Sequence, residues 1–87
     1  MLSDRLLIKK AYVECSKYRL NAIKAIGIDD VKTPTTIAKD SGIRVNHISR
    51  VLRDLKNVDL VVCLNEDRKK GRLYRLTKDG EKIYNEL

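Results

Sequence analysis

The sequence predicts a small, mainly α-helical domain that carries one β-hairpin. Apolar residues recur at helical spacing over residues 3–26, 35–57 and 78–87, whereas residues 60–64 and 73–77 are β-branched or alternate between apolar and polar. With 87 residues, the chain has room for one compact core. We therefore expect a single domain over the whole chain.

The first 26 residues predict two helices. Residues 3–26 contain neither Gly nor Pro, and their apolar positions are too many for one narrow stripe. We expect a break near Ser16, with an N-terminal helix over 3–15 and a first domain helix over 17–26 that Ser16 caps. The wide apolar surface of residues 3–15 must be covered. We expect it to form a homodimer interface, to which the C-terminal helix contributes; the alternative is a long helix lying across its own core.

Residues 35–57 have the pattern of two short helices joined by a tight turn. Ala38 lets the helices approach closely, and Gly42 suits a left-handed turn position. Thr33 and Thr35 are both candidate N-caps of the first helix. The second helix is held against the first by a set of apolar residues at helical spacing, namely Ile48, Val51, Leu52 and Leu55.

The opposite face of the second helix is polar and basic. Arg side chains pair with guanine, Asn with adenine, and Ser with either base or backbone. The alternative is a solvated polar face, but three arginines against Asp54 alone favour a recognition helix. The candidate DNA-contacting residues on it are Arg44, Val45, Asn46, His47, Ser49, Arg50 and Arg53, and those at the start of the preceding helix are Thr35 and Thr36.

Positive charge is concentrated in the central and hairpin segments. The chain has 19 Lys and Arg against 12 Asp and Glu, for a net charge of +7. Residues 31–57 carry six basic and two acidic residues, whereas residues 1–30 carry six and four. This distribution favours a polyanionic partner. No apolar run approaches the roughly 18 residues of a membrane span, and residues 1–5 do not begin the long apolar region of a secretory signal. We therefore expect a cytoplasmic protein without a membrane partner.

A basic hairpin is predicted over residues 60–77. Its two strands flank a polar loop over 65–72, in which Gly71 supplies turn freedom. Ile28 or Val31, in the connection before residue 35, is a candidate anchor for a short strand. Thr77 is expected to cap a final helix over 78–87. The candidate DNA-contacting residues of the loop are Arg68, Lys69, Lys70 and Arg72; the alternative is a solubilising loop, since Glu66 and Asp67 dilute its charge.

Nearly the whole chain resembles the MarR-like and ArsR-like winged-helix transcription regulators of prokaryotic type, archaeal members included. Residues 16–23 (Ser-Lys-Tyr-Arg-Leu-Asn-Ala-Ile) resemble the first domain helix of that superfamily. Residues 73–80 contain its Tyr-x-Leu-Thr-x-x-Gly pattern, where the wing closes and the last helix starts. The resemblance implies a winged helix-turn-helix with an additional N-terminal helix and a C-terminal helix. It also implies sequence-specific binding of double-stranded DNA.

The resemblance divides the DNA contacts among the candidate residues. It places the helix over 44–57 in the major groove, with Asn46, Ser49 and Arg50 nearest the bases, and Arg44, Arg53 and Thr36 on phosphates. The four basic wing residues would lie along the backbone or in the flanking minor groove. Asn57-Val58-Asp59 replaces the usual Gly after this helix, but Asn and Asp tolerate the left-handed conformation. A chain of this length leaves little room for a ligand pocket. The sequence does not indicate whether a small molecule regulates the protein.

Other functions have weaker support. A winged helix can serve as a protein-interaction or RNA-binding module, although acidic or apolar residues would then be expected on the recognition face. We expect no enzyme, because the chain has no Ser-His-Asp set and no Gly-rich phosphate loop. We expect no cofactor and no metal, because a zinc site needs about four ligands and only His47 accompanies the cysteines. Cys15 and Cys63 are interpreted as buried small hydrophobes, with a thiol sensor as the alternative.

Overall fold

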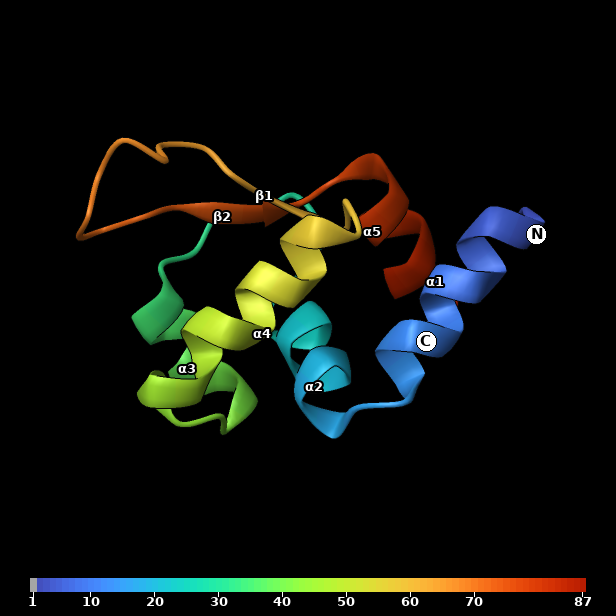
Figure 1. Ribbon diagram of the computed structural model, residues 1–87, viewed down its shortest axis with the longest axis horizontal. Helices are drawn as coiled ribbons and strands as arrows, with labels where there is room; N and C mark the ends of the chain where they lie inside the picture. Colours follow the sequence, from blue (N-terminus) through green and yellow to red (C-terminus); the bar gives the residue numbers. More distant parts are fainter. Residues whose placement is uncertain (1) are drawn as a thin grey trace.

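The computed structural model describes residues 2–87, which form five helices and a two-stranded hairpin within about 36 × 23 × 20 Å (Figure 1). The mainly helical fold class with one small hairpin is confirmed. The hairpin projects from one end of the molecule, and the first helix lies at the other (Figure 1). In chain order the elements are α1 (Asp4–Glu14), α2 (Lys17–Ile26), α3 (Pro34–Ser41), α4 (Val45–Asn57), β1 (Val61–Cys63), β2 (Tyr74–Leu76) and α5 (Lys78–Tyr84).

Helices α1 and α2 are separated at Ser16. The Ser16 hydroxyl accepts a hydrogen bond from the Arg19 backbone N–H at 3.3 Å, which caps the start of α2. α1 packs against α2 and α5, and Leu6 and Val13 on that side are buried. Part of the apolar surface of α1 is therefore covered within the chain, while Leu7 and Ile8 stay 49% and 72% exposed.

The helix-turn-helix is formed by α3 and α4. Thr33 is the N-cap of α3 and Pro34 its first residue, a position where the missing N–H of proline costs nothing. Gly42 ends α3 with φ 76°, as expected for a left-handed turn residue. α4 begins at Val45, and Arg44 is its N-cap without a capping side-chain bond, so the predicted start at residue 44 lies one residue too early.

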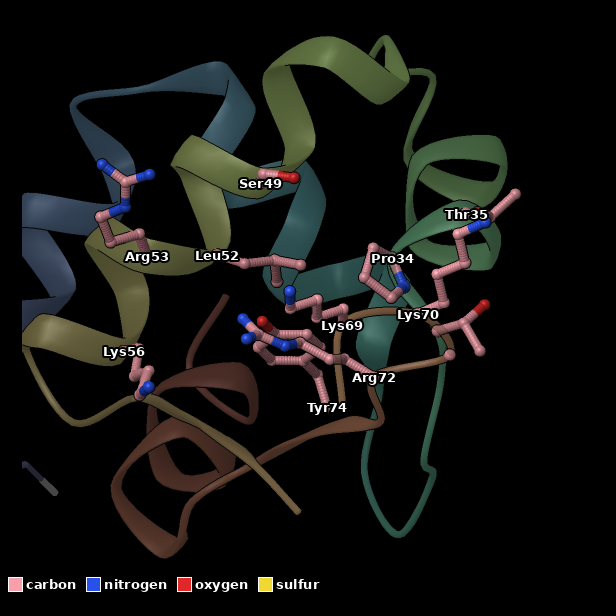
Figure 2. A pocket seen from close by; sticks show the side chains of 12 residues that line it. Pro34, Thr35, Ser49, Leu52, Arg53, Lys56, Lys69, Lys70, Arg72 and Tyr74 are labelled. Atoms are coloured by element: carbon pink, nitrogen blue, oxygen red, sulfur yellow. The ribbon is translucent and has the colours of Figure 1, made fainter. Parts of the chain in front are cut away.

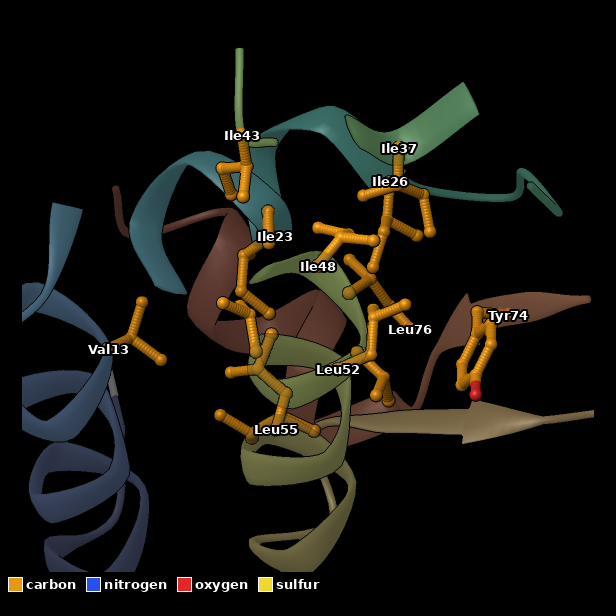
Figure 3. Close-up of a cluster of buried hydrophobic side chains, with 14 of the residues drawn as sticks. Val13, Ile23, Ile26, Ile37, Ile43, Ile48, Leu52, Leu55, Tyr74 and Leu76 are labelled. Atoms are coloured by element: carbon orange, nitrogen blue, oxygen red, sulfur yellow. The ribbon is translucent and has the colours of Figure 1, made fainter. Parts of the chain in front are cut away.

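The core lies between the helix-turn-helix, α2 and the hairpin. Figure 3 shows side chains from α2, α3, α4 and β2 converging on one centre, with Val13 of α1 at its side. The apolar face predicted for α4 is buried in full. The largest side chains with less than 2% exposure include Ile23, Ile26, Ile37, Ile48, Leu52, Leu55, Leu60 and Leu76.

The hairpin is antiparallel, with Val61, Val62 and Cys63 opposite Leu76, Arg75 and Tyr74. The ladder proper is shorter than predicted, although the Leu64 N–H still donates to the Leu73 carbonyl at 2.8 Å. β2 has a second neighbour on its other edge, because Lys32 and Tyr74 exchange backbone hydrogen bonds of 3.0 and 2.9 Å. The expected strand contact before α3 therefore forms at Lys32, not at Ile28 or Val31.

The turn between α4 and β1 is hydrogen-bonded to the residue that caps α5. Asp59 adopts the left-handed conformation with φ 60°, so an Asp there serves the purpose of the usual Gly. The Thr77 hydroxyl donates to the Asp59 carbonyl at 2.7 Å and accepts from the Gly80 N–H at 3.0 Å. α5 ends at Tyr84, three residues before the predicted end at 87.

None of the helices within residues 2–87 combines the length and apolar character required to cross a membrane.

Candidate nucleic-acid interface

The outward face of α4 presents the predicted recognition residues to solvent. Arg44, at the N-cap of α4, is exposed, and so are the six candidates within the helix: Val45, Asn46, His47, Ser49, Arg50 and Arg53. At about 100° per residue, Asn46 and Arg50 point away from the buried face, whereas Ser49 and Arg53 lie toward the hairpin. α4 is 13 residues long, and its apolar side is buried in the core. The polar side chains therefore project from a helix that is packed against the rest of the domain.

A groove of about 670 Å³ runs between α4, the start of α3 and the hairpin (Figure 2). Figure 2 shows the contributing side chains arriving from these three elements. We call this feature the groove; its lining residues are Thr33, Pro34, Thr35, Ser49, Leu52, Arg53, Lys56, Lys69, Lys70, Gly71, Arg72 and Tyr74.

The groove is lined by cations and hydroxyl groups. Two of its cations come from α4 and three from the loop between the strands, and the hydroxyl-bearing residues are Thr33 and Thr35 at the start of α3, Ser49 of α4 and Tyr74 of β2. No carboxylate is among the lining side chains of the part of the chain that the structure describes. Cationic and hydroxyl side chains are the groups that proteins use to hold phosphate oxygens, so the groove is chemically suited to a phosphodiester backbone.

The wing loop (residues 64–73) is held together by internal hydrogen bonds. The Asn65 amide donates to the Gly71 carbonyl at 3.2 Å, and its oxygen accepts from the Leu73 N–H at 2.7 Å. The Arg72 guanidinium donates to the carbonyls of Arg68 at 2.6 Å and Glu66 at 3.2 Å. Arg72, predicted as a DNA contact, therefore also braces the loop.

The structure brings some predicted site residues together and leaves others apart. The groove combines Thr35, Ser49 and Arg53 with three basic residues of the wing loop. The predicted residues outside the groove lining are Thr36, Arg44, Val45, Asn46, His47, Arg50 and Arg68.

Sequence reasoning missed Thr33, Lys56 and Asn65. Thr33 and Lys56 line the groove. Lys56 continues the Ser49 and Arg53 side of α4 at helical spacing, which is a usable signal. An Asn at the start of a hairpin loop is a known turn former, so a structural role for Asn65 could have been suspected.

On the side of α4 away from the groove, His47 lies beside Tyr18 of α2. Their ring centroids are 5.9 Å apart and the ring planes are inclined by 35°. Tyr18 is 48% exposed. This aromatic pair joins α4 to α2 at the protein surface.

The two cysteines differ in environment. Cys63 is buried, with its Sγ 3.7 Å from the Asn65 amide oxygen, as expected for a small hydrophobe. Cys15 is exposed at the end of α1, contrary to that expectation, because its position faces away from Leu6 and Val13. Within residues 2–87, no group of three His, Cys, Asp or Glu side chains is arranged to hold a metal ion.

Comparison with known proteins yields a structural match. The chain matches no family model and no curated protein. Among solved structures it is similar to the crystal structure of NadR in complex with 4-hydroxyphenylacetate, with a TM-score of 0.70 and 21% sequence identity. The match covers 93% of this chain and 61% of that NadR chain. At this identity the similarity concerns the fold, and the fold of this chain is the winged helix-turn-helix.

Proposed function

We propose that this protein is a transcription regulator that binds double-stranded DNA in a sequence-specific manner. The observation that carries the proposal is the groove, where cations from α4 and the wing loop face each other beside the polar outer face of the recognition helix. NadR, a MarR-family transcription regulator with the same fold, supports extending that class of function to this chain. Such a regulator would act in the cytoplasm, where prokaryotic DNA lies.

The dimensions of α4 suit the major groove of B-form DNA. A helix with its side chains is about 10–12 Å across, and the major groove is about 12 Å wide. With α4 inserted, Asn46 and Arg50 would face base edges, and Ser49 would lie between the bases and one backbone. The phosphates of that backbone would then pass through the groove between α4 and the wing loop, where Lys69 and Lys70 stand.

We further propose that the protein acts as a homodimer through α1. The side of α1 opposite its buried residues presents Leu7, Ile8, Ala11 and Cys15 to solvent, a mostly apolar stripe on an otherwise charged molecule. A two-fold dimer would carry two recognition helices, and a palindromic site would offer half-sites about 34 Å apart.

The first test is binding to a labelled random-sequence duplex, measured by fluorescence anisotropy between about 50 and 200 mM salt. We expect binding that weakens steeply with salt. The double variant Lys69→Gln/Lys70→Gln should bind all duplexes more weakly, and its slope of log K against log salt should be smaller by about 1.8. The matched control is Lys78→Gln/Lys82→Gln, which removes two exposed cations from α5 and should retain the wild-type slope.

Two results would contradict the proposal. Absence of duplex binding at the lowest salt would reject a DNA-binding function and favour a protein-interaction module. Equal losses in the wing variant and the α5 control would mean that net charge alone, and not the groove, attracts DNA.

A further inference from the structure

We propose a second backbone contact, formed by Lys17 and Tyr18 of α2 together with His47 of α4, on the side of the recognition helix opposite the wing. We call these three residues the far edge. They would bind phosphates of the DNA strand across the major groove from the wing. This inference rests on the duplex-binding function proposed above.

The far edge combines three groups that bind phosphate oxygens. Lys17 and Tyr18 are the first two residues of α2, and both are exposed. The Tyr18 ring lies beside the exposed His47 ring, with 5.9 Å between the centroids and the planes inclined by 35°, so the Tyr18 ring borders the imidazole on this flank of α4. The pair brings a hydroxyl and an imidazole together from two packed helices, and the exposed ammonium of Lys17 follows from the residue that precedes Tyr18 in α2.

Arg19, the next residue in α2, contacts α1. The Arg19 guanidinium lies 3.7 Å from the centre of the Tyr12 ring and donates to the Tyr12 carbonyl at 3.0 Å. It therefore braces the junction of α1 and α2. Lys17 and Tyr18, which precede it, are left to face solvent.

The helical geometry of α4 puts the far edge opposite the groove. His47 and Lys56 are nine residues apart, which is half a turn around the axis at about 100° per residue. Lys56 lines the groove, so His47 lies on the other flank. A helix that fills the major groove of DNA has one phosphate backbone on each flank. The groove on the protein would bind one of these backbones, and the far edge would contact the other.

An acidic residue limits the extent of this contact. Asp54 is half-buried on the same flank as His47, seven residues later and hence about 10 Å further along the axis. Its carboxylate would repel a backbone there. The far edge contact is therefore confined to the first turns of α4, beside the base-facing residues Asn46 and Arg50.

Two conservative variants test the inference. Lys17→Gln removes one charge, and Tyr18→Phe removes the hydroxyl while the ring that packs on His47 remains. Lys17→Gln should bind all duplexes more weakly, with a salt slope smaller by about 0.9. Tyr18→Phe should lose severalfold in affinity with an unchanged sequence preference. The matched control, Lys82→Gln on α5, should keep the wild-type slope, and equal melting temperatures would show that all variants fold.

Phosphate-ethylation interference on a selected site shows which backbone is involved. We expect wild-type interference on both strands that flank the major groove, and its loss in Lys17→Gln only on the strand across from the wing. If both variants bind with wild-type affinity and slope while Lys69→Gln/Lys70→Gln is weakened, the far edge is refuted and the DNA-binding function stands. If the wild-type protein binds no duplex, both proposals fail together.

Discussion

The Lys56 ammonium near the end of α4 pairs with the Glu66 carboxylate at the start of the wing loop. The pair joins the two walls of the groove, and both side chains remain about half exposed, at 44% and 53%. An exposed ion pair of this kind contributes little to stability, but it occupies one of the five cations that line the groove. In the proposed DNA complex, Glu66 would therefore compete with phosphate for Lys56.

Removing this competitor should strengthen DNA binding. We expect Glu66→Gln to raise the affinity for random duplexes by about two- to fivefold and to make the salt slope steeper, because Lys56 becomes free to neutralise a phosphate. Fluorescence anisotropy at several salt concentrations measures both effects. Glu86→Gln, which changes an exposed carboxylate beyond α5, is the control. An equal gain in the two variants would mean that only net charge matters.

Arg50 should determine sequence preference. Its side chain is exposed on the outward face of α4 and lies outside the groove. Arg50→Ala should cost about 1–3 kcal/mol on a site selected from a random library and relax the preference at one base pair. Its affinity for random duplexes should fall much less. Unchanged affinity for the selected site would show that the base-contacting face is assigned wrongly.

A charged substitution at Ile8 tests the proposed dimerisation through α1. This side chain is 72% exposed on α1, so Ile8→Lys should leave the folded protomer intact and place a charge in the interface. We expect the wild-type protein to have the mass of a dimer in analytical ultracentrifugation, and the variant that of a monomer with the same melting temperature. A wild-type monomer at high concentration would contradict dimerisation through α1.

Gly80 is required by close packing between α5 and the chain before β1. A Cβ at this position would collide with the Leu60 backbone carbonyl. A Gly→Ala substitution in a helix normally raises the free energy of unfolding by about 1 kcal/mol. Here we expect Gly80→Ala to lower it by about 1–3 kcal/mol. Urea unfolding measures the change, and Lys82→Ala in the same helix should have little effect. A stabilised Gly80→Ala variant would refute this packing.

Asp79 should make stability depend on pH in the acidic range. The Arg5 guanidinium donates to its carboxylate at 2.8 Å, and this hydrogen bond holds the pKa of Asp79 below its usual 3.8. Because the pKa is lower in the folded state, the pair stabilises the fold above that usual value, and the contribution is lost as pH falls through the folded pKa. Asp79→Asn should therefore be less stable than wild type near about pH 6, with a smaller difference near about pH 3. A difference that does not change with pH in urea unfolding would contradict this linkage.

Local patterns were sufficient to predict most of the fold. The spacing of Ile48, Val51, Leu52 and Leu55 identifies the buried side of α4, because a helix turns by a fixed angle per residue. Ser16 marks the break between α1 and α2, because its hydroxyl satisfies a backbone N–H at the helix start. Such signals act over a few residues and need no knowledge of the tertiary structure.

The groove could not be predicted in the same way. It combines Thr33, Lys56 and Tyr74, which lie far apart in the chain and meet only after the hairpin docks beside α3 and α4. The Lys56–Glu66 and Tyr18–His47 contacts likewise depend on how whole elements pack. Sequence patterns indicate which way a side chain points within its own element, but not which other element it meets.

The backbone bridge between Lys32 and Tyr74 connects the wing to the helix-turn-helix. Lys32 directly precedes the N-cap of α3, so β2 is bonded on one edge to β1 and on the other to the start of the helix-turn-helix. These bonds tie the base of the wing to the start of α3, and we therefore expect the distance between the wing and α4 to vary little. A-form duplexes have a deep and narrow major groove, which α4 and the wing could not enter together. If the protein binds duplex DNA as proposed, this frame would therefore favour the B form over the A form before any base is contacted.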